Sequence, residues 1–143
     1  MKNYFILISA FCLILTSCNS TPKEIAYGSD GCHFCSMTIV DKQHAAQFMT
    51  QKGRSYVFDA SECMLNHLKE IDLSTVAIFL VNDYNAPGET IDATKATYLV
   101  SKNIPSPMGE YLSAFASVEA AKKAQAENKG ELFKWEELKT RFK

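Results

Sequence analysis

The sequence has nearly equal numbers of acidic and basic residues. It has no apolar run after residue 18 that is long enough to span a membrane, and no recognisable hydrolase motif. Its 15 Lys and Arg residues and 16 Asp and Glu residues give a net charge of −1. The basic residues are scattered apart from Lys122 and Lys123, which argues against nucleic acid as a partner. After residue 18, no stretch approaches the roughly 20 apolar residues that a transmembrane helix needs. No Ser/His/Asp set, phosphate loop or carboxylate pair indicates a hydrolase.

What the N-terminus does contain is the pattern of an export signal. A positive charge precedes an apolar run from Tyr4 to Leu15, which has the length of a signal-peptide core. The run ends in Leu15-Thr16-Ser17-Cys18, which resembles a bacterial lipobox, where cleavage precedes a cysteine that carries diacylglycerol. An ordinary signal peptide with an incidental cysteine is the alternative. We expect a signal peptide over residues 1–17, a lipid anchor at Cys18, a tether over 18–29 and a place in the bacterial envelope facing the periplasm.

The number of cysteines is odd once the N-terminus is accounted for. Five are encoded, but Cys12 would leave with the signal peptide and Cys18 would be acylated. Cys32, Cys35 and Cys63 remain, in a compartment that usually favours disulfides. At least one of them is therefore unpaired, and it is either buried and inert or kept for metal or redox chemistry.

Residues 30–143 are expected to form one compact α+β domain around a sheet. Alternating or β-branched apolar residues predict strands over 37–41, 44–51, 54–59, 76–81, 96–102 and 111–116. The strand over 76–81 is apolar throughout, which is typical of burial on both faces. Helical spacing predicts one helix from Ser61 to Ile71 and another, capped by Ser117, to about Asn128. Trp135, Leu138 and Phe142 are expected in the core. The order strand, strand, helix thus occurs twice, in modules over about 30–82 and 95–143.

The segment Cys32-His-Phe-Cys35-Ser-Met37 concentrates two thiols, an imidazole and a thioether within six residues. A tight turn can bring the sulfur atoms of Cys32 and Cys35 onto one ion. Thiolate and thioether donors favour copper(I) over hard cations. The thioether of Met37 favours copper over zinc, because zinc sites use Cys, His and carboxylate ligands.

Three other interpretations of this motif stay open. The first is a thioredoxin-like redox pair, but such a pair normally precedes a long helix, whereas β-branched residues follow Cys35. The second is half of a structural zinc site completed by His44, Cys63 or His67, which would leave Met37 unexplained. The third is a plain disulfide.

The wider pattern resembles the NosL family over roughly residues 24–142. The matching segments are Cys32-His-Phe-Cys35-Ser-Met37-Thr-Ile, Asp41-Lys-x-His44-Ala-Ala-Gln47, Phe58-Asp59, Glu62-Cys63, Pro107-Met108-Gly109 and Ala114-Phe115. The resemblance implies a fold of two small ββαβ-type modules. It further implies a non-enzymatic lipoprotein that chaperones copper(I) for the copper–sulfide centre of periplasmic nitrous-oxide reductase. Its partners would be a membrane transporter complex and a copper-accepting periplasmic protein.

Carried onto this sequence, the resemblance assigns metal donors in the cysteine motif and in the later Pro-Met-Gly loop: Cys32, Cys35, Met37 and Met108. Three further side chains are candidates for ligation or for support of the ligands: Cys63, His44 and His33. For each of the three a structural role is the alternative, with Cys63 as a small core residue, His44 held in a strand and His33 turned away. Copper(I) is the expected metal, with zinc as the alternative.

Overall fold

The computed structural model describes residues 21–142. The predicted signal peptide and the anchor at Cys18 lie outside the described residues. Within the part of the chain that is described, no helix combines the length and the apolar character needed to cross a bilayer.

The first module is a four-stranded antiparallel sheet in the order β2-β1-β3-β4. Its strands are β1 (Ala46–Thr50), β2 (Ser55–Phe58), β3 (Val76–Asn82) and β4 (Thr90–Asp92). The helix α2 (Ser61–His67) and the short 3-10 helix η1 (Leu73–Thr75) connect β2 to β3. β1 is central because it pairs with its hairpin partner β2 on one side and with β3 on the other.

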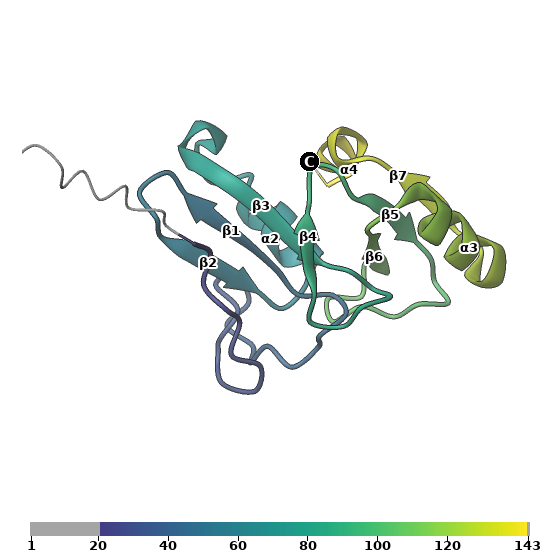
Figure 1. The fold of residues 1–143 in the computed structure, drawn as a ribbon, viewed down its shortest axis with the longest axis horizontal. Coiled ribbons are helices and arrows are strands. Elements are labelled where there is room, and N and C mark those ends of the chain that lie inside the picture. The colour runs from purple at the N-terminus through teal and green to yellow at the C-terminus, as the bar shows by residue number, and fades with distance from the viewer. Residues whose placement is uncertain (1–20, 143) are drawn as a thin grey trace, which may run out of the picture.

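The second module repeats this topology in a three-stranded antiparallel sheet, β6-β5-β7. Its strands are β5 (Thr97–Val100), β6 (Leu112–Phe115) and β7 (Glu131–Phe133), with α3 (Val118–Asn128) before β7 and α4 (Trp135–Arg141) after it. Again the first strand of the hairpin is central, flanked by its hairpin partner and by the strand that follows the helix. The predicted repeat and the α+β fold class are therefore confirmed, and the two sheets stand beside each other in Figure 1.

One apolar core joins the two modules into a single domain. Phe48, Phe58 and Met64 of the first module share it with Tyr98 and Leu112 of the second. A smaller cluster lies under α3 and uses the other side of β5, where it is formed by Leu99, Ile104, Phe115, Ala121 and Ala124. β5 is thus buried on both faces because its alternating side chains enter different clusters.

Several local predictions are confirmed. The Ser117 hydroxyl accepts a hydrogen bond from the Ala120 amide at 3.1 Å and caps α3. The helix ends before Gly130, whose φ of +103° favours glycine and where a Cβ would stand 2.2 Å from the Val100 carbonyl oxygen. Trp135 and Leu138 are buried, and Phe142 packs against the same core.

Other local predictions are wrong. Residues 37–41 form a loop with one bridge, Gly31 to Thr38, because the segment lies against residues 28–31 and not beside a sheet strand. β3 is fully buried only at Val81 and Asn82, and its earlier residues are half-buried or exposed although Val76 and Phe79 pack against the main core. α2 stops at His67 instead of continuing to Ile71. The tether was predicted to reach residue 29, but Ile25 is already buried in the main core.

Candidate metal centre

Three cysteines from two distant segments meet at one point. The Sγ atoms of Cys32, Cys35 and Cys63 all lie within 4.8 Å of one another, and within residues 21–142 all three cysteines are free. Cys63 is fully buried and Cys32 is 3% exposed, while Cys35 is partly accessible. The arrangement is a small cup of thiols with one sulfur atom towards solvent.

The loop over residues 32–37 is closed on itself, and this closure sets the position of its two thiols. The Cys32 amide donates to the Met37 carbonyl at 2.8 Å, and the Ser36 amide donates to the Cys32 carbonyl at 2.9 Å. Ser36 has a φ of +64°, which reverses the chain after Cys35. The Cys35 amide is also 3.5 Å from Cys32 Sγ and donates to it. The two-residue spacing therefore brings the sulfur atoms together through the backbone.

Cys63 reaches the same point from the first turn of α2. That helix begins directly after β2 and packs against both β1 and β2. The loop is held against this sheet because the His33 amide donates to the Val57 carbonyl at 2.9 Å. The third thiol thus comes from tertiary packing, 28 residues further along the chain than Cys35.

Hydrogen bonding and burial give the three thiols different pKa values. The Cys63 thiol donates to Cys32 Sγ, and this bond, together with donation by backbone amides, lowers the pKa of Cys32 to about 4. The same hydrogen bond, with burial, strongly raises the pKa of Cys63. Burial also raises the pKa of Cys35. The thiolate is therefore favoured at Cys32 and the protonated form at Cys35 and Cys63, so a bound cation would displace protons from the latter two.

A buried carboxyl group lies next to the thiolate. Asp59 is 2% exposed, and among the described residues its Oδ1 has no hydrogen-bond partner. Burial raises the pKa of Asp59, and the nearby Cys32 thiolate raises it further. Both effects favour the neutral acid, which limits the negative charge beside Cys32.

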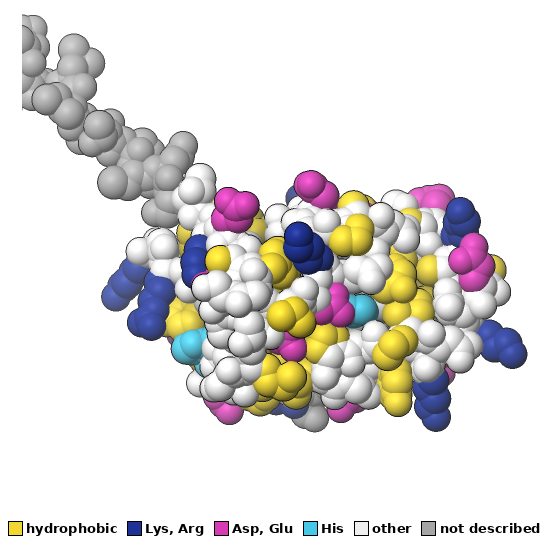
Figure 2. Space-filling view, turned by 90° about the horizontal axis from the view of Figure 1, so that it is seen from below, with side chains coloured by type: hydrophobic (Ala, Val, Ile, Leu, Met, Phe, Trp, Pro, Cys, Tyr) yellow, Lys and Arg dark blue, Asp and Glu magenta, His cyan; other side chains and the backbone are white. Residues whose placement is uncertain are grey.

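The rim of the cup is apolar and exposed. Phe34 is 38% exposed and Met37 53%, both on the loop that carries Cys32 and Cys35, and Val40, three residues after that loop, is 66% exposed. Figure 2 shows the side of the molecule on which this loop lies, with hydrophobic side chains across its middle and most Lys and Arg side chains towards its ends. Exposed apolar side chains gathered around a reactive group indicate a contact surface.

The two methionines predicted as donors occupy different environments. Met37 closes the cysteine loop with its carbonyl group and leaves its side chain in solvent. Met108 is half-buried and packs against the main core, which also contains Cys32 and Cys63. Their roles as metal donors stay predictions.

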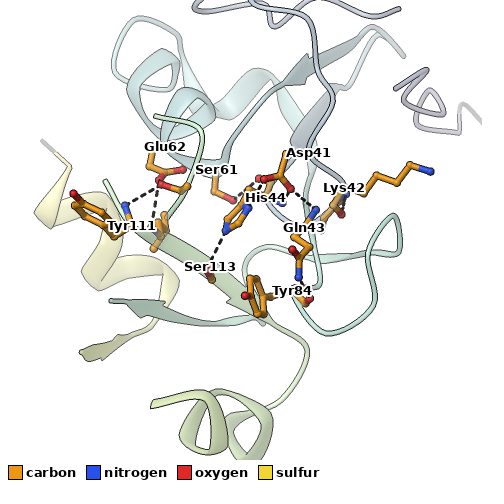
Figure 3. Close-up of polar contacts among 12 residues, drawn as sticks. Asp41, Lys42, Gln43, His44, Ser61, Glu62, Tyr84, Tyr111 and Ser113 are labelled. Carbon is orange, nitrogen blue, oxygen red and sulfur yellow. Dashed lines mark hydrogen bonds and ion pairs between the residues drawn. The ribbon is translucent and has the colours of Figure 1, made fainter. Parts of the chain in front are cut away.

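His44 lies between the modules, with both ring nitrogens engaged. Nδ1 is 2.9 Å from Asp41 Oδ2, and Nε2 is 3.2 Å from the Ser113 hydroxyl on β6 (Figure 3). This Asp–His–Ser arrangement, which no sequence motif revealed, has the connectivity of a hydrolytic triad. However, His44 is 4% and Ser113 1% exposed, so a substrate has no access to the hydroxyl. The group joins the two modules, and neither imidazole nitrogen is free to ligate a metal.

Glu62 makes a second buried connection between the modules. Its Oε1 accepts hydrogen bonds from the Ser106 hydroxyl and from the Leu112 amide, the latter at 3.3 Å (Figure 3). The Ser106 hydroxyl in turn accepts from the Tyr111 amide at 2.9 Å. Glu62 therefore fixes both ends of the loop that carries Met108. Burial raises the pKa of this carboxyl group, and the Ser106 hydrogen bond lowers it in part.

Comparison with known proteins places the chain in a family. A family model named NosL matches residues 24–142. The chain belongs to the NosL family. Among solved structures, the copper chaperone NosL from Shewanella denitrificans is similar, with a TM-score of 0.72 and 20% identity, over 82% of this chain and 95% of that chain. At this identity the likeness to that NosL structure shows a common fold. Proteins of curated function gave no match.

The structure thus brings together three of the residues singled out in this NosL-family sequence and places His44 elsewhere. Cys32, Cys35 and Cys63 form one group, whereas His44 belongs to the module interface. The sequence left two roles open for Cys63, which were a small core residue and a metal ligand. The odd number of cysteines after residue 18 indicated that one of them is unpaired, but it did not show that Cys63 joins the other two.

We predict that Glu62→Ala lowers the free energy of unfolding by about 2–4 kcal/mol, because it leaves the Ser106 hydroxyl and the Leu112 amide unpaired next to a cavity. Glu62→Gln should cost less, since its amide oxygen can still accept both hydrogen bonds. Glu127→Ala, at an exposed position of α3, is the control. The measurement is urea unfolding of the reduced, metal-free protein. A Glu62→Ala variant as stable as the control would contradict the assigned role.

Proposed function

We propose that this NosL-family protein binds copper(I) at Cys32, Cys35 and Cys63 and delivers it to another protein without catalysing a reaction. The observation that carries the proposal is the convergence of three thiols within 4.8 Å. Copper is the cargo of such a protein, so the site has to release the ion as well as bind it. The family and the fold of a solved copper chaperone support the same function.

The donor set suits copper(I) better than zinc. Sulfur donors favour copper(I), which is a soft ion. Structural zinc sites use four ligands from Cys, His and carboxylate side chains, whereas the described residues bring only three such groups together here. A methionine sulfur would complete a copper site but is not a zinc ligand. A third thiol beside the Cys-x-x-Cys pair also favours metal binding over the thioredoxin-like interpretation.

Release is favoured by the graded exposure of the donors. Cys63 is fully buried, Cys35 is partly accessible and Met37 is 53% exposed. An incoming donor from an acceptor would therefore approach Cys35 first and replace the buried thiols one at a time. The acceptor has to cover Phe34 and Val40 to do so, which explains apolar side chains in this exposed loop.

We further propose that the acceptor belongs to the maturation of periplasmic nitrous-oxide reductase, either the copper-accepting protein itself or its membrane transporter complex. The family membership supports this destination. A lipid anchor at Cys18 would hold the protein at the membrane, with the domain in the periplasm. The lipobox pattern at residues 15–18 supports the anchor.

We predict one tight copper(I) equivalent per chain in anaerobic competition with a copper(I) chelator. Cys63→Ala should weaken it by more than about 100-fold, the upper limit for loss of a mere supporting group around a metal. Met108→Leu should weaken it less and leave the thermal midpoint unchanged. Met64→Leu, a buried neighbour of Cys63, is the control and should have no effect. Preferential retention of zinc, or full affinity in Cys63→Ala, would argue against the site.

We predict that Phe34→Ser with Val40→Ser slows copper transfer to the apo reductase or its transporter complex by about tenfold, through loss of about 1.4 kcal/mol of apolar contact. Transfer to a small chelator should be unchanged, because a chelator needs no docking surface. Leu73→Ser is the matched control, since Leu73 is 40% exposed and lies outside the loop. Equal slowing by the Leu73 variant would show that the loop surface has no special role.

We predict that Cys18→Ala moves the protein from the membrane pellet to the soluble fraction of cells, because no described helix can replace the lipid as an anchor. Metabolic labelling with a fatty acid should mark the wild type and not the variant. Continued pelleting of Cys18→Ala would exclude the anchor.

A further inference from the structure

Two of the three histidines of the chain stand side by side next to the thiol centre. The ring centroids of His33 and His67 are 4.9 Å apart and their planes are nearly perpendicular, at 88°. His33 directly follows Cys32, and His67 lies one helical turn after Cys63 on α2. Each imidazole is therefore attached to the same segment as one thiol of the cup.

The surrounding side chains hold the pair in place. The His67 ring stacks on Phe48 with centroids 6.0 Å apart, and the His33 ring packs edge-on against Tyr56 at 4.6 Å. Glu70 Oε2 lies 3.7 Å from His67 Nδ1. At this distance the carboxylate is not hydrogen-bonded to the ring, but its negative charge lies close to the imidazole and favours a cation there. His33 is exposed, so the pair is reached from solvent while Cys32 and Cys63 are not.

We propose that His33 and His67 form a second, outer copper(I) site, which takes up the ion from solvent and passes it to the thiol centre. The inference rests on the proposed copper function. Imidazole is a good donor to copper, and the ion would move from a nitrogen pair to a sulfur set that holds it more tightly. Copper remains in the +1 state throughout. The two copper–nitrogen bonds are replaced by copper–sulfur bonds to the cysteines of the thiol centre, and each cysteine that is still a thiol loses its proton to water.

The test is a titration of the reduced full-length protein with copper(I) beyond one equivalent. The wild type should bind a second, weaker equivalent whose X-ray absorption adds nitrogen scattering to the sulfur of the first. His33→Gln and His67→Phe should each lose the second equivalent and load the thiols more slowly, with the affinity of the first unchanged. Glu70→Gln should weaken the second equivalent by about threefold, because it removes an exposed negative charge close to the bound cation.

His67→Phe separates metal binding from packing, since phenylalanine keeps the ring against Phe48 and removes the nitrogens. Retention of the second equivalent in His67→Phe, or a wild type that binds only one, would overturn the outer site while leaving the proposed function intact. Absence of the tight first equivalent in the wild type would instead refute the proposed function, and the outer site with it.

Discussion

The packing of two small ββαβ modules on one shared core is the constraint on which the candidate metal centre depends. Each sheet has only three or four strands and is stabilised by a second layer against its apolar face. Here the second layer comes from the other module, so that Phe48 and Met64 meet Tyr98 and Leu112. α2 lies at this junction and carries both Cys63 and Glu62. The position of the third thiol is therefore fixed by the same packing that holds the modules together.

Buried polar groups at the junction specify how the modules meet. His44 with Asp41 and Ser113, and Glu62 with Ser106, are hydrogen-bonded across it. Such groups add little net stability when paired but are costly when separated, so they exclude other relative placements of the modules. The Asp–His–Ser group also shows that the connectivity of a catalytic triad carries no activity without access to its hydroxyl. In this protein the arrangement is part of the architecture.

At the metal centre, the fold creates an asymmetry that the composition of the motif does not contain. A thiolate at Cys32 is stabilised by the Cys63 thiol and by backbone amides, while Cys35 stands towards solvent among exposed apolar side chains. The buried side of the centre is thus suited to retaining a soft cation and the exposed side to giving it up. A closed cage of four ligands would bind more firmly but would block the exchange that delivery requires.

The sequence by itself determined the repeated strand–strand–helix order, the cap of α3 at Ser117 and the proximity of the Cys32 and Cys35 sulfur atoms, because each depends on residues close together in the chain. It could not decide between strand and loop at residues 37–41, since β-branched residues form a strand only where a partner strand is available. It also left the role of Cys63 undecided and gave no sign of the contact between His44 and Ser113, which are 69 residues apart. Those contacts exist only once the shared core has brought the two modules together. Local patterns therefore predicted most of the elements and two of the three thiols of the metal centre. Tertiary packing supplied the third thiol, its hydrogen bond to Cys32 and the differences in burial among the three sulfur atoms.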